Sequence, residues 1–341
     1  MSLYPLKFKP RYVAKMWGGR KIEARLGKSL PPGAIGESWE VYDFPPGVVG
    51  ESGDWISSEV AEGPLAGKTL HELVGEFGRD LYGSAPLVGP QDQFPILIKF
   101  LDAAQDLSVQ VHPDELYAKA NPGAHLKNEA WFIVQADPGS RLLKGLRPGV
   151  TRESFAKAIA EGSVESSINS IAVNAGDCFY LPSGTVHALG AGILAAEVQT
   201  PSDTTFRVFD FNRIDPSTWR LRTLHVEEAM KCIDFSGGAQ RLKPALGPDL
   251  VECDQFSIRR ITLKKGREVS IPAGEPIIVM FIEGQGRLTC AESEEPIDFS
   301  RGDTVLLPAS LQQSMVTASG DSLWLEVRFS NIQTRSPSGR G

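Results

Sequence analysis

Short apolar runs separated by frequent Gly and Pro dominate the chain. There are 34 Gly and 24 Pro, and the runs between them are rich in β-branched and aromatic residues. This texture is typical of an all-β sandwich or barrel. In residues 108–114, SVQVHPD, polar and apolar positions alternate with the period of two that a β-strand imposes. We therefore expect Gln110 and His112 to share one strand face, with Val109 and Val111 on the other.

Two segments show helical spacing instead. Residues 68–81 carry apolar side chains at positions 70, 73, 74, 77 and 81, with Thr69 as a candidate N-cap. Residues 151–160 carry an apolar stripe at positions 155, 158 and 159, with Thr151 as a candidate N-cap. We expect both helices to pack against the β-structure rather than to carry a functional site.

An internal repeat indicates the architecture. Residues 175–182, AGDCFYLP, resemble residues 301–308, RGDTVLLP, and the strand WFIV at 131–134 resembles MFIE at 280–283. Each copy has a strand, a long gap, a Gly-Asp turn and a second strand ended by Pro, which is the pattern of a cupin jelly roll. The sequence thus predicts a mainly β protein of tandem cupin jelly-roll barrels with a few helical insertions.

Composition limits the functional classes. The 341 residues are 41% hydrophobic and 23% charged, which is typical of a globular protein long enough for two domains. A net charge of −7 argues against a nucleic-acid binder, and no signal peptide or membrane-spanning apolar run is visible. The four Cys form no CxxC pair, so free thiols in a cytoplasmic protein are expected.

Four side chains are candidate ligands of one metal ion: Gln110, His112, Glu129 and His187. Glu129 shares a predicted strand face with Lys127, and His187 lies in a turn after a Pro-terminated strand. Imidazole and carboxylate ligands suit zinc, and a site with an open position is typical of catalysis. The alternatives are ordinary polar residues on a half-exposed strand, a solvated Lys–Glu pair and a loop histidine.

The repeat predicts which copy holds the metal. Aligning the Gly-Asp-strand-Pro motifs places Gln313 where the first copy has His187, and aligning the preceding strands places Ile278 where it has Glu129. The second copy has therefore lost both ligand types. We predict an N-terminal metal-binding cupin domain with helical insertions over 1–235, a degenerate, structural or capping C-terminal jelly roll over 236–333, and a disordered tail over 334–341.

Three cationic side chains are candidates for contacts with an anionic substrate. Lys127 would project into the same space as Glu129, and a nearby divalent cation disfavours its charged form, so Lys127 is a candidate for proton transfer. Lys99 is the single Lys in an otherwise apolar strand, where it either snorkels outward or points into a polar cavity. Arg207 is either a surface residue or a guanidinium for a phosphate or oxyanion.

Several motifs, in order along the chain, resemble the type I mannose-6-phosphate isomerase family in its short bacterial form. They are MWGG at 16–19, IGESWE at 35–40, the block 94–114, KNEAW at 127–131, SGTVHA at 183–188 and the segment 197–210. Asn128 and Ala130 depart from the family pattern, but both side chains should point away from the face of Lys127 and Glu129.

The resemblance implies an aldose–ketose isomerase that interconverts mannose 6-phosphate and fructose 6-phosphate through a cis-enediol. It implies one zinc ion per chain, held by the four candidate ligands, with Lys127 and Arg207 flanking the substrate. Ser108 and Lys99 would help to hold the phosphate, and Glu197 is a weaker candidate for the catalytic base. A small phosphosugar is then the expected partner of a monomer or homodimer, without nucleic acid or membrane.

Two alternatives remain open. The first is another metal enzyme on the same fold, such as an oxygenase or an isomerase of a different phosphosugar. The second is a non-catalytic cupin that senses a sugar phosphate. Turnover of the phosphosugar distinguishes these alternatives from the isomerase.

Overall fold

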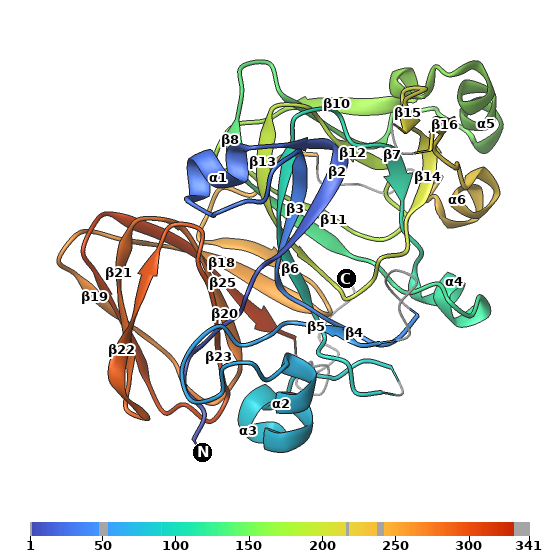
Figure 1. Ribbon diagram of the computed structural model, residues 1–341. Coiled ribbons are helices and arrows are strands. Elements are labelled where there is room, and N and C mark those ends of the chain that lie inside the picture. Colours follow the sequence, from blue (N-terminus) through green and yellow to red (C-terminus); the bar gives the residue numbers. More distant parts are fainter. Residues whose placement is uncertain (1, 48–53, 90, 216–217, 237–241, 331–341) are drawn as a thin grey trace, which may run out of the picture.

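The computed structural model describes residues 2–47, 54–89, 91–215, 218–236 and 242–330. The predicted tail, 334–341, lies outside the described residues. Two jelly rolls lie side by side, with the N-terminal strands on one side of the molecule and the orange to red C-terminal strands on the other (Figure 1). This arrangement confirms the predicted class, which is mainly β with helical insertions.

The N-terminal jelly roll consists of two antiparallel sheets. Its six-stranded sheet has the order β11 (Cys178–Leu181), β8 (Glu129–Ala136), β13 (Ile193–Gln199), β6 (Leu97–Ala103), β3 (Ile35–Val41) and β2 (Arg11–Gly19). Its five-stranded sheet has the order β10 (Ile168–Ala172), β9 (Arg141–Leu146), β12 (His187–Leu189), β7 (Val109–Val111) and β14 (Phe206–Phe209). A buried apolar cluster that includes Trp131, Ile133, Leu142 and Leu189 fills part of the space between the two sheets.

The C-terminal jelly roll repeats this plan. Its six-stranded sheet has the order β1 (Leu6–Lys7), β23 (Thr304–Leu307), β20 (Ile277–Glu283), β25 (Ser322–Phe329), β18 (Phe256–Leu263) and β17 (Asp249–Glu252). Its four-stranded sheet has the order β19 (Glu268–Ile271), β24 (Ser314–Ala318), β21 (Gln285–Cys290) and β22 (Ser293–Ser300). Two short ribbons pair β4 (Asp43–Phe44) with β5 (Ile56–Ser57), and β15 (Ile214–Asp215) with β16 (Arg220–Leu221).

Both predicted helices are present. Thr69 caps α2 (Leu70–Phe77) in a capping box with Glu72, and the chain turns at Gly78 into α3 (Arg79–Tyr82). Thr151 caps α5 (Arg152–Glu161) in the same way. The remaining helical segments are α1 (Lys21–Leu26), α4 (Glu115–Ala120), the 3₁₀ turn η1 (Val164–Ser167) and α6 (Val226–Cys232). Among the described residues, no helix is both long and apolar enough to cross a membrane.

The largest apolar cluster lies between the two jelly rolls. The six-stranded sheets contribute alternate side chains to it, for example Ala130 and Phe132 from β8 and Ile278 and Met280 from β20. The opposite side chains of the same strands, such as Ile133 and Phe281, point into their own jelly rolls. The central strands of both six-stranded sheets, such as β6, β13 and β20, are therefore buried on both faces, which explains their nearly continuous apolar sequences.

The first strand of the chain belongs to the C-terminal sheet. Leu6 of β1 pairs with Leu306 of β23, although some 300 residues separate them. The proposed N-terminal domain, 1–235, thus gives one strand to the other jelly roll. We retain the division into 1–235 and 236–333 as a proposal.

The structure corrects the alignment of the two copies by one residue. The amide of Ile133 donates to the carbonyl of Asp177, and the amide of Phe281 donates to that of Asp303 in the same way. Glu129 pairs with Leu181, as Ile277 pairs with Leu307. The counterpart of Glu129 is therefore Ile277, not Ile278.

A second correction concerns the counterpart of His187. His187 begins β12, and the buried Ser314 begins β24. Gln313 is exposed and donates its side-chain amide to Ser270. An insertion of one residue in the C-terminal turn explains the difference. Neither correction restores a ligand, because Ile277 and Ser314 cannot replace a carboxylate and an imidazole.

Candidate active site and metal centre

A cavity of about 300 Å³ opens in the N-terminal jelly roll. It is lined by side chains from β2, β3, β6, β8 and β13 of the six-stranded sheet and from β7 and β14 of the five-stranded sheet. Seven of the residues singled out from the sequence line it: Lys99, Ser108, Gln110, Lys127, Glu129, Glu197 and Arg207. The other two, His112 and His187, contact Glu129.

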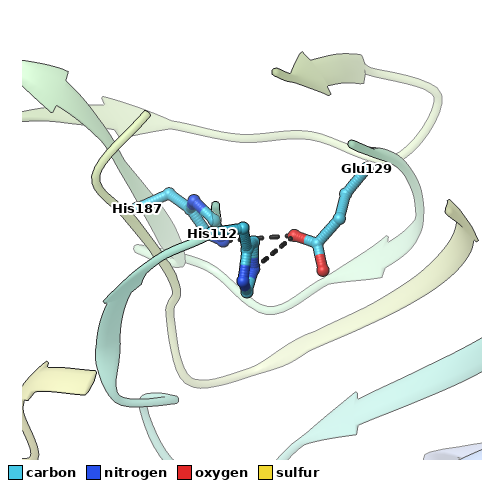
Figure 2. Close-up of side chains that lie close together, drawn as sticks. All are labelled: His112, Glu129 and His187. Carbon is cyan, nitrogen blue, oxygen red and sulfur yellow. Dashed lines mark ion pairs between the residues drawn. The ribbon is translucent and has the colours of Figure 1, made fainter. Parts of the chain in front are cut away.

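Three of the four candidate ligands converge on one point. Oε2 of Glu129 lies 3.3 Å from Nε2 of His112 and 3.1 Å from Nε2 of His187, and each side chain is only 1% exposed (Figure 2). One ligand atom from each residue lies within 4.8 Å of the others. The alternation of β7 sends Val109 and Val111 to the opposite face, where α5 and α6 cover them.

Backbone carbonyls orient both imidazoles. Nδ1 of His112 lies 3.0 Å from the carbonyl oxygen of Thr204, and Nδ1 of His187 lies 2.9 Å from that of Thr185. A carbonyl only accepts hydrogen bonds, so each Nδ1 donates a proton to its carbonyl. Each Nε2 then faces Glu129, which is the arrangement of metal-ligating histidines and their outer-shell partners.

The donor set fits a divalent cation. Among the described residues, Nε2 of His112 and Oε2 of Glu129 are buried without a hydrogen-bond partner. Burial lowers the pKa of His112 to about 3, so its ring is neutral. Burial alone would raise the pKa of Glu129, but the neighbouring Lys127 holds it well below its usual value. Neutral imidazoles beside an ionised carboxylate are the ligand states that a metal ion requires.

The fourth candidate, Gln110, lies directly opposite His187 on the neighbouring strand. Its Nε2 is 3.4 Å from Nε2 of His187, and its Oε1 accepts a long hydrogen bond, 3.4 Å, from the Ser108 hydroxyl. An amide binds a cation through its oxygen. Gln110 can therefore join the ligands only if its side-chain amide rotates so that Oε1 and Nε2 exchange places.

Lys99 and Glu197 form a buried ion pair beside this centre. The two residues are paired on β6 and β13, and Nζ of Lys99 lies 2.7 Å from Oε2 of Glu197. The indole of Trp131 donates to the other oxygen of Glu197 at 2.6 Å. Of the two predictions for Lys99, the one that points it into the cavity is correct.

Arg207 occupies another wall of the cavity. Its Nε donates to the Ser108 hydroxyl at 3.2 Å, and its Nη1 donates to the carbonyl of Thr223 at 2.9 Å. Burial and the nearby Arg222 lower the pKa of Arg207 to about 10. A half-buried guanidinium next to a second arginine favours an anion at this point.

The sequence reasoning missed four charged residues of the cavity: Lys15, Glu37, Asp203 and Arg222. Nζ of Lys15 lies 3.2 Å from Oε1 of Glu37, and the indole of Trp39 donates to Oε2 at 2.7 Å. Burial alone would raise the pKa of Glu37, yet Lys99 and Lys15 lower it to about 2. Lys15 and Trp17 are two residues apart, as are Glu37 and Trp39, so each pair shares a strand face. This spacing was the sequence signal that could have identified Lys15 and Glu37.

Glycines bring these two strands together. A Cβ on Gly18 of β2 would lie 2.5 Å from the backbone nitrogen of Gly36 in β3, and a Cβ on Gly36 would lie 2.7 Å from the ring of Trp17. No side chain fits at either contact. The motifs MWGG at 16–19 and IGESWE at 35–40 therefore form the wall of the cavity that carries Lys15 and Glu37.

Comparisons with known proteins identify relatives of this chain. The family model described as phosphomannose isomerase type I, catalytic domain, matches residues 6–132. A mannose-6-phosphate isomerase of Bacillus subtilis is 36% identical over 320 residues, which are 91% of this chain and 95% of the relative. A Bacillus subtilis mannose 6-phosphate isomerase crystal structure has a TM-score of 0.81 at 30% identity, covering 95% of this chain and 99% of that one.

A zinc-bound mannose 6-phosphate isomerase shares the fold, with a TM-score of 0.71 at 17% identity over 96% of this chain and 99% of its own. The match to the more similar Bacillus subtilis relative extends over nearly the full length of both sequences. This chain therefore belongs to the family of type I mannose-6-phosphate isomerases.

Proposed function

We propose that the protein is a zinc-dependent isomerase that interconverts mannose 6-phosphate and fructose 6-phosphate through a cis-enediol. The observation that carries the proposal is the buried cluster of His112, Glu129 and His187 beside a cavity that also holds Lys99, Lys127 and Arg207. Cationic side chains suit a phosphorylated substrate, and the His/Glu/His set suits zinc. The names of the relatives and the zinc-bound protein of the same fold support both points.

Gln110, His112, Glu129 and His187 would hold one zinc ion per chain. When bound, zinc acts as a Lewis acid that polarises the carbonyl oxygen of the sugar. The reaction moves a proton between C1 and C2, so the protein must also supply a proton carrier and a positive charge for the developing enediolate. The remaining cavity residues can perform both tasks.

Lys127 is the proposed proton carrier. Its Nζ lies 2.8 Å from Oε1 of Glu129 and thus next to the proposed metal. Glu197 is the weaker candidate, because the ammonium of Lys99 and the indole of Trp131 engage its two oxygens. A carboxylate with both oxygens engaged is a poorer base than a free one.

Arg207 would stabilise the enediolate, and Ser108 and Lys99 would hold the phosphate. The Ser108 hydroxyl already contacts Arg207, so a ligand oxygen that binds Ser108 also lies near the guanidinium. A small phosphosugar is therefore the proposed partner. The cytoplasmic location and the monomeric or dimeric state stay predictions.

A coupled assay tests the proposal. Purified protein is loaded with zinc or treated with a chelator, and the conversion of mannose 6-phosphate to fructose 6-phosphate is measured, with unphosphorylated mannose as the control. We expect turnover that requires both zinc and the phosphate. Zinc binding without turnover would contradict the proposal and lead to tests of other aldose phosphates, or of a sensing role.

A further inference from the structure

Asn128, which lies between Lys127 and Glu129 in the sequence, forms a hydrogen bond to the C-terminal jelly roll. Asn128 is buried, 6% exposed, and its side chain lies on the opposite face of the chain from Lys127 and Glu129. Its Nδ2 donates to Oε1 of Gln255 at 2.9 Å. Gln255 lies in the turn between β17 and β18 of the C-terminal jelly roll.

The same amide also holds the loop that precedes His187. Oδ1 of Asn128 accepts a hydrogen bond of 2.8 Å from the backbone N–H of Ser183. In that loop the N–H of Gly184 donates to the carbonyl of His112 at 3.0 Å, and the carbonyl of Thr185 orients His187. One side chain therefore connects the segment of Glu129, the loop of His187 and the second jelly roll.

The anchor on the C-terminal side is itself fixed. The carbonyl of Gln255 accepts from the N–H of Ser330 at 3.1 Å, and the Ser330 hydroxyl donates to the carbonyl of Cys253 at 2.7 Å. The following residue, Phe256, is fully buried in the cluster between the jelly rolls. Gln255 therefore presents its Oε1 from a turn held by hydrogen bonds, and the loss of this acceptor would leave the buried amide of Asn128 with an unsatisfied donor.

We propose that the Asn128–Gln255 hydrogen bond positions Lys127 and Glu129, so that the C-terminal jelly roll sets the geometry of the active site across the domain interface. Asn128 and Gln255 are positioning residues, because neither lines the cavity. The inference rests on the proposed function for its effect on turnover. Its effect on metal affinity is independent of turnover.

The test compares Gln255→Met, which removes the acceptor at similar length, with Gln255→Glu, which keeps one. We expect Gln255→Met to lower kcat and metal affinity each by about 10-fold, as the loss of outer-shell partners does, with KM for mannose 6-phosphate unchanged. The kcat and the metal affinity of Gln255→Glu should stay within about twofold of the wild-type values. Zinc affinity is measured by competition with a chelator, and melting temperatures identify variants that fail to fold.

Glu283→Gln is the matched control, because it removes another polar link between the jelly rolls, the ion pair of Glu283 with Arg25. This control should leave kcat and metal affinity unchanged. The proposal is overturned if Gln255→Met behaves like the wild type, or if Glu283→Gln lowers both quantities as much. If the wild type binds zinc but does not isomerise, the proposed function fails and metal affinity alone decides the inference. If it does neither, both fail.

Discussion

Nζ of Lys127 lies 2.8 Å from Oε1 of Glu129, whereas the two imidazoles face the other oxygen of the same carboxylate. Glu129 therefore divides its oxygens between an ammonium and the proposed metal position. This division would separate two proposed functions that mutations can test independently, because metal binding would depend on one side of the carboxylate and proton transfer on the other.

Replacement of a histidine tests the metal centre. His112→Ala removes one of two buried imidazoles and leaves Glu129 without that partner. We expect zinc affinity and turnover to fall together, each by more than the 100-fold or so that loss of an outer-shell partner can cost. Zinc content by atomic absorption and the coupled assay measure both. His71→Ala on α2, outside the cavity, is the control. Full activity of His112→Ala without zinc would refute the metal assignment.

Replacement of Lys127 tests the proton carrier. Lys127→Met keeps most of the side-chain length but cannot carry a proton. We expect kcat to fall by about 10² to 10⁴, the usual contribution of a general acid–base group, while zinc remains bound. Single-turnover kinetics with a zinc measurement on the same sample separate the two effects. A Lys127→Met enzyme with near-normal kcat would shift the role to Glu197.

Arg207→Lys tests whether the guanidinium geometry matters. Arg207 uses Nε for Ser108 and Nη1 for the carbonyl of Thr223, and a single ammonium cannot span both contacts. We expect kcat to fall by about 100-fold, the cost of removing one donor to a developing oxyanion. Steady-state kinetics distinguish the roles, because a change confined to KM would mean that Arg207 holds the phosphate instead.

The pH dependence of kcat/KM tests Lys99. Burial lowers the pKa of Lys99 to about 8, so the ammonium that would attract phosphate loses its proton as the pH rises through that value. The substrate phosphate has its second pKa near 6 and remains a dianion throughout this range. We expect kcat/KM to decline by about tenfold per pH unit above pH 8. In Lys99→Arg the decline should move to higher pH; an unchanged profile would exclude Lys99.

A substitution remote from the cavity tests whether stability and activity are separable. Thr69 accepts a hydrogen bond from the N–H of Glu72, and the Glu72 side chain accepts from the N–H of Thr69. Thr69→Ala should lower the free energy of unfolding by about 1 kcal/mol without changing kcat. Urea denaturation measures this change. Thr69→Ser, whose hydroxyl can also cap the helix, should leave the free energy of unfolding almost unchanged.

Period-two alternation predicted part of the arrangement of the site, because two pairs of its residues each lie on one strand or next to it. Gln110 and His112 share a face of one segment, as Lys127 and Glu129 do of another, and local geometry alone fixes both pairs. The class of fold followed from the repeat, which is found by comparing the sequence with itself. These features required no knowledge of which strands are neighbours.

Features that depend on strand pairing could not be predicted. The alignment that placed Ile278 on Glu129 was wrong by one residue, because both neighbouring positions are Ile and sequence similarity cannot separate them. The wall formed by Lys15 and Glu37 depends on β3 lying between β6 and β2, which is a property of the sheet order. The contact of Asn128 with Gln255 spans 127 residues and two jelly rolls.

β1 pairs with β23, so two neighbouring strands of the C-terminal sheet are synthesised far apart in time. Leu6 is synthesised before its partner Leu306, which follows about 300 residues later. At roughly 5 to 20 residues per second, the growing chain takes about 15 to 60 s to reach that partner. During this interval β1 cannot make its native hydrogen bonds to β23, and the Leu6 side chain, which is buried in the folded protein, lacks its native contacts with that strand. Folding of the C-terminal sheet is therefore complete only after β23 has been synthesised.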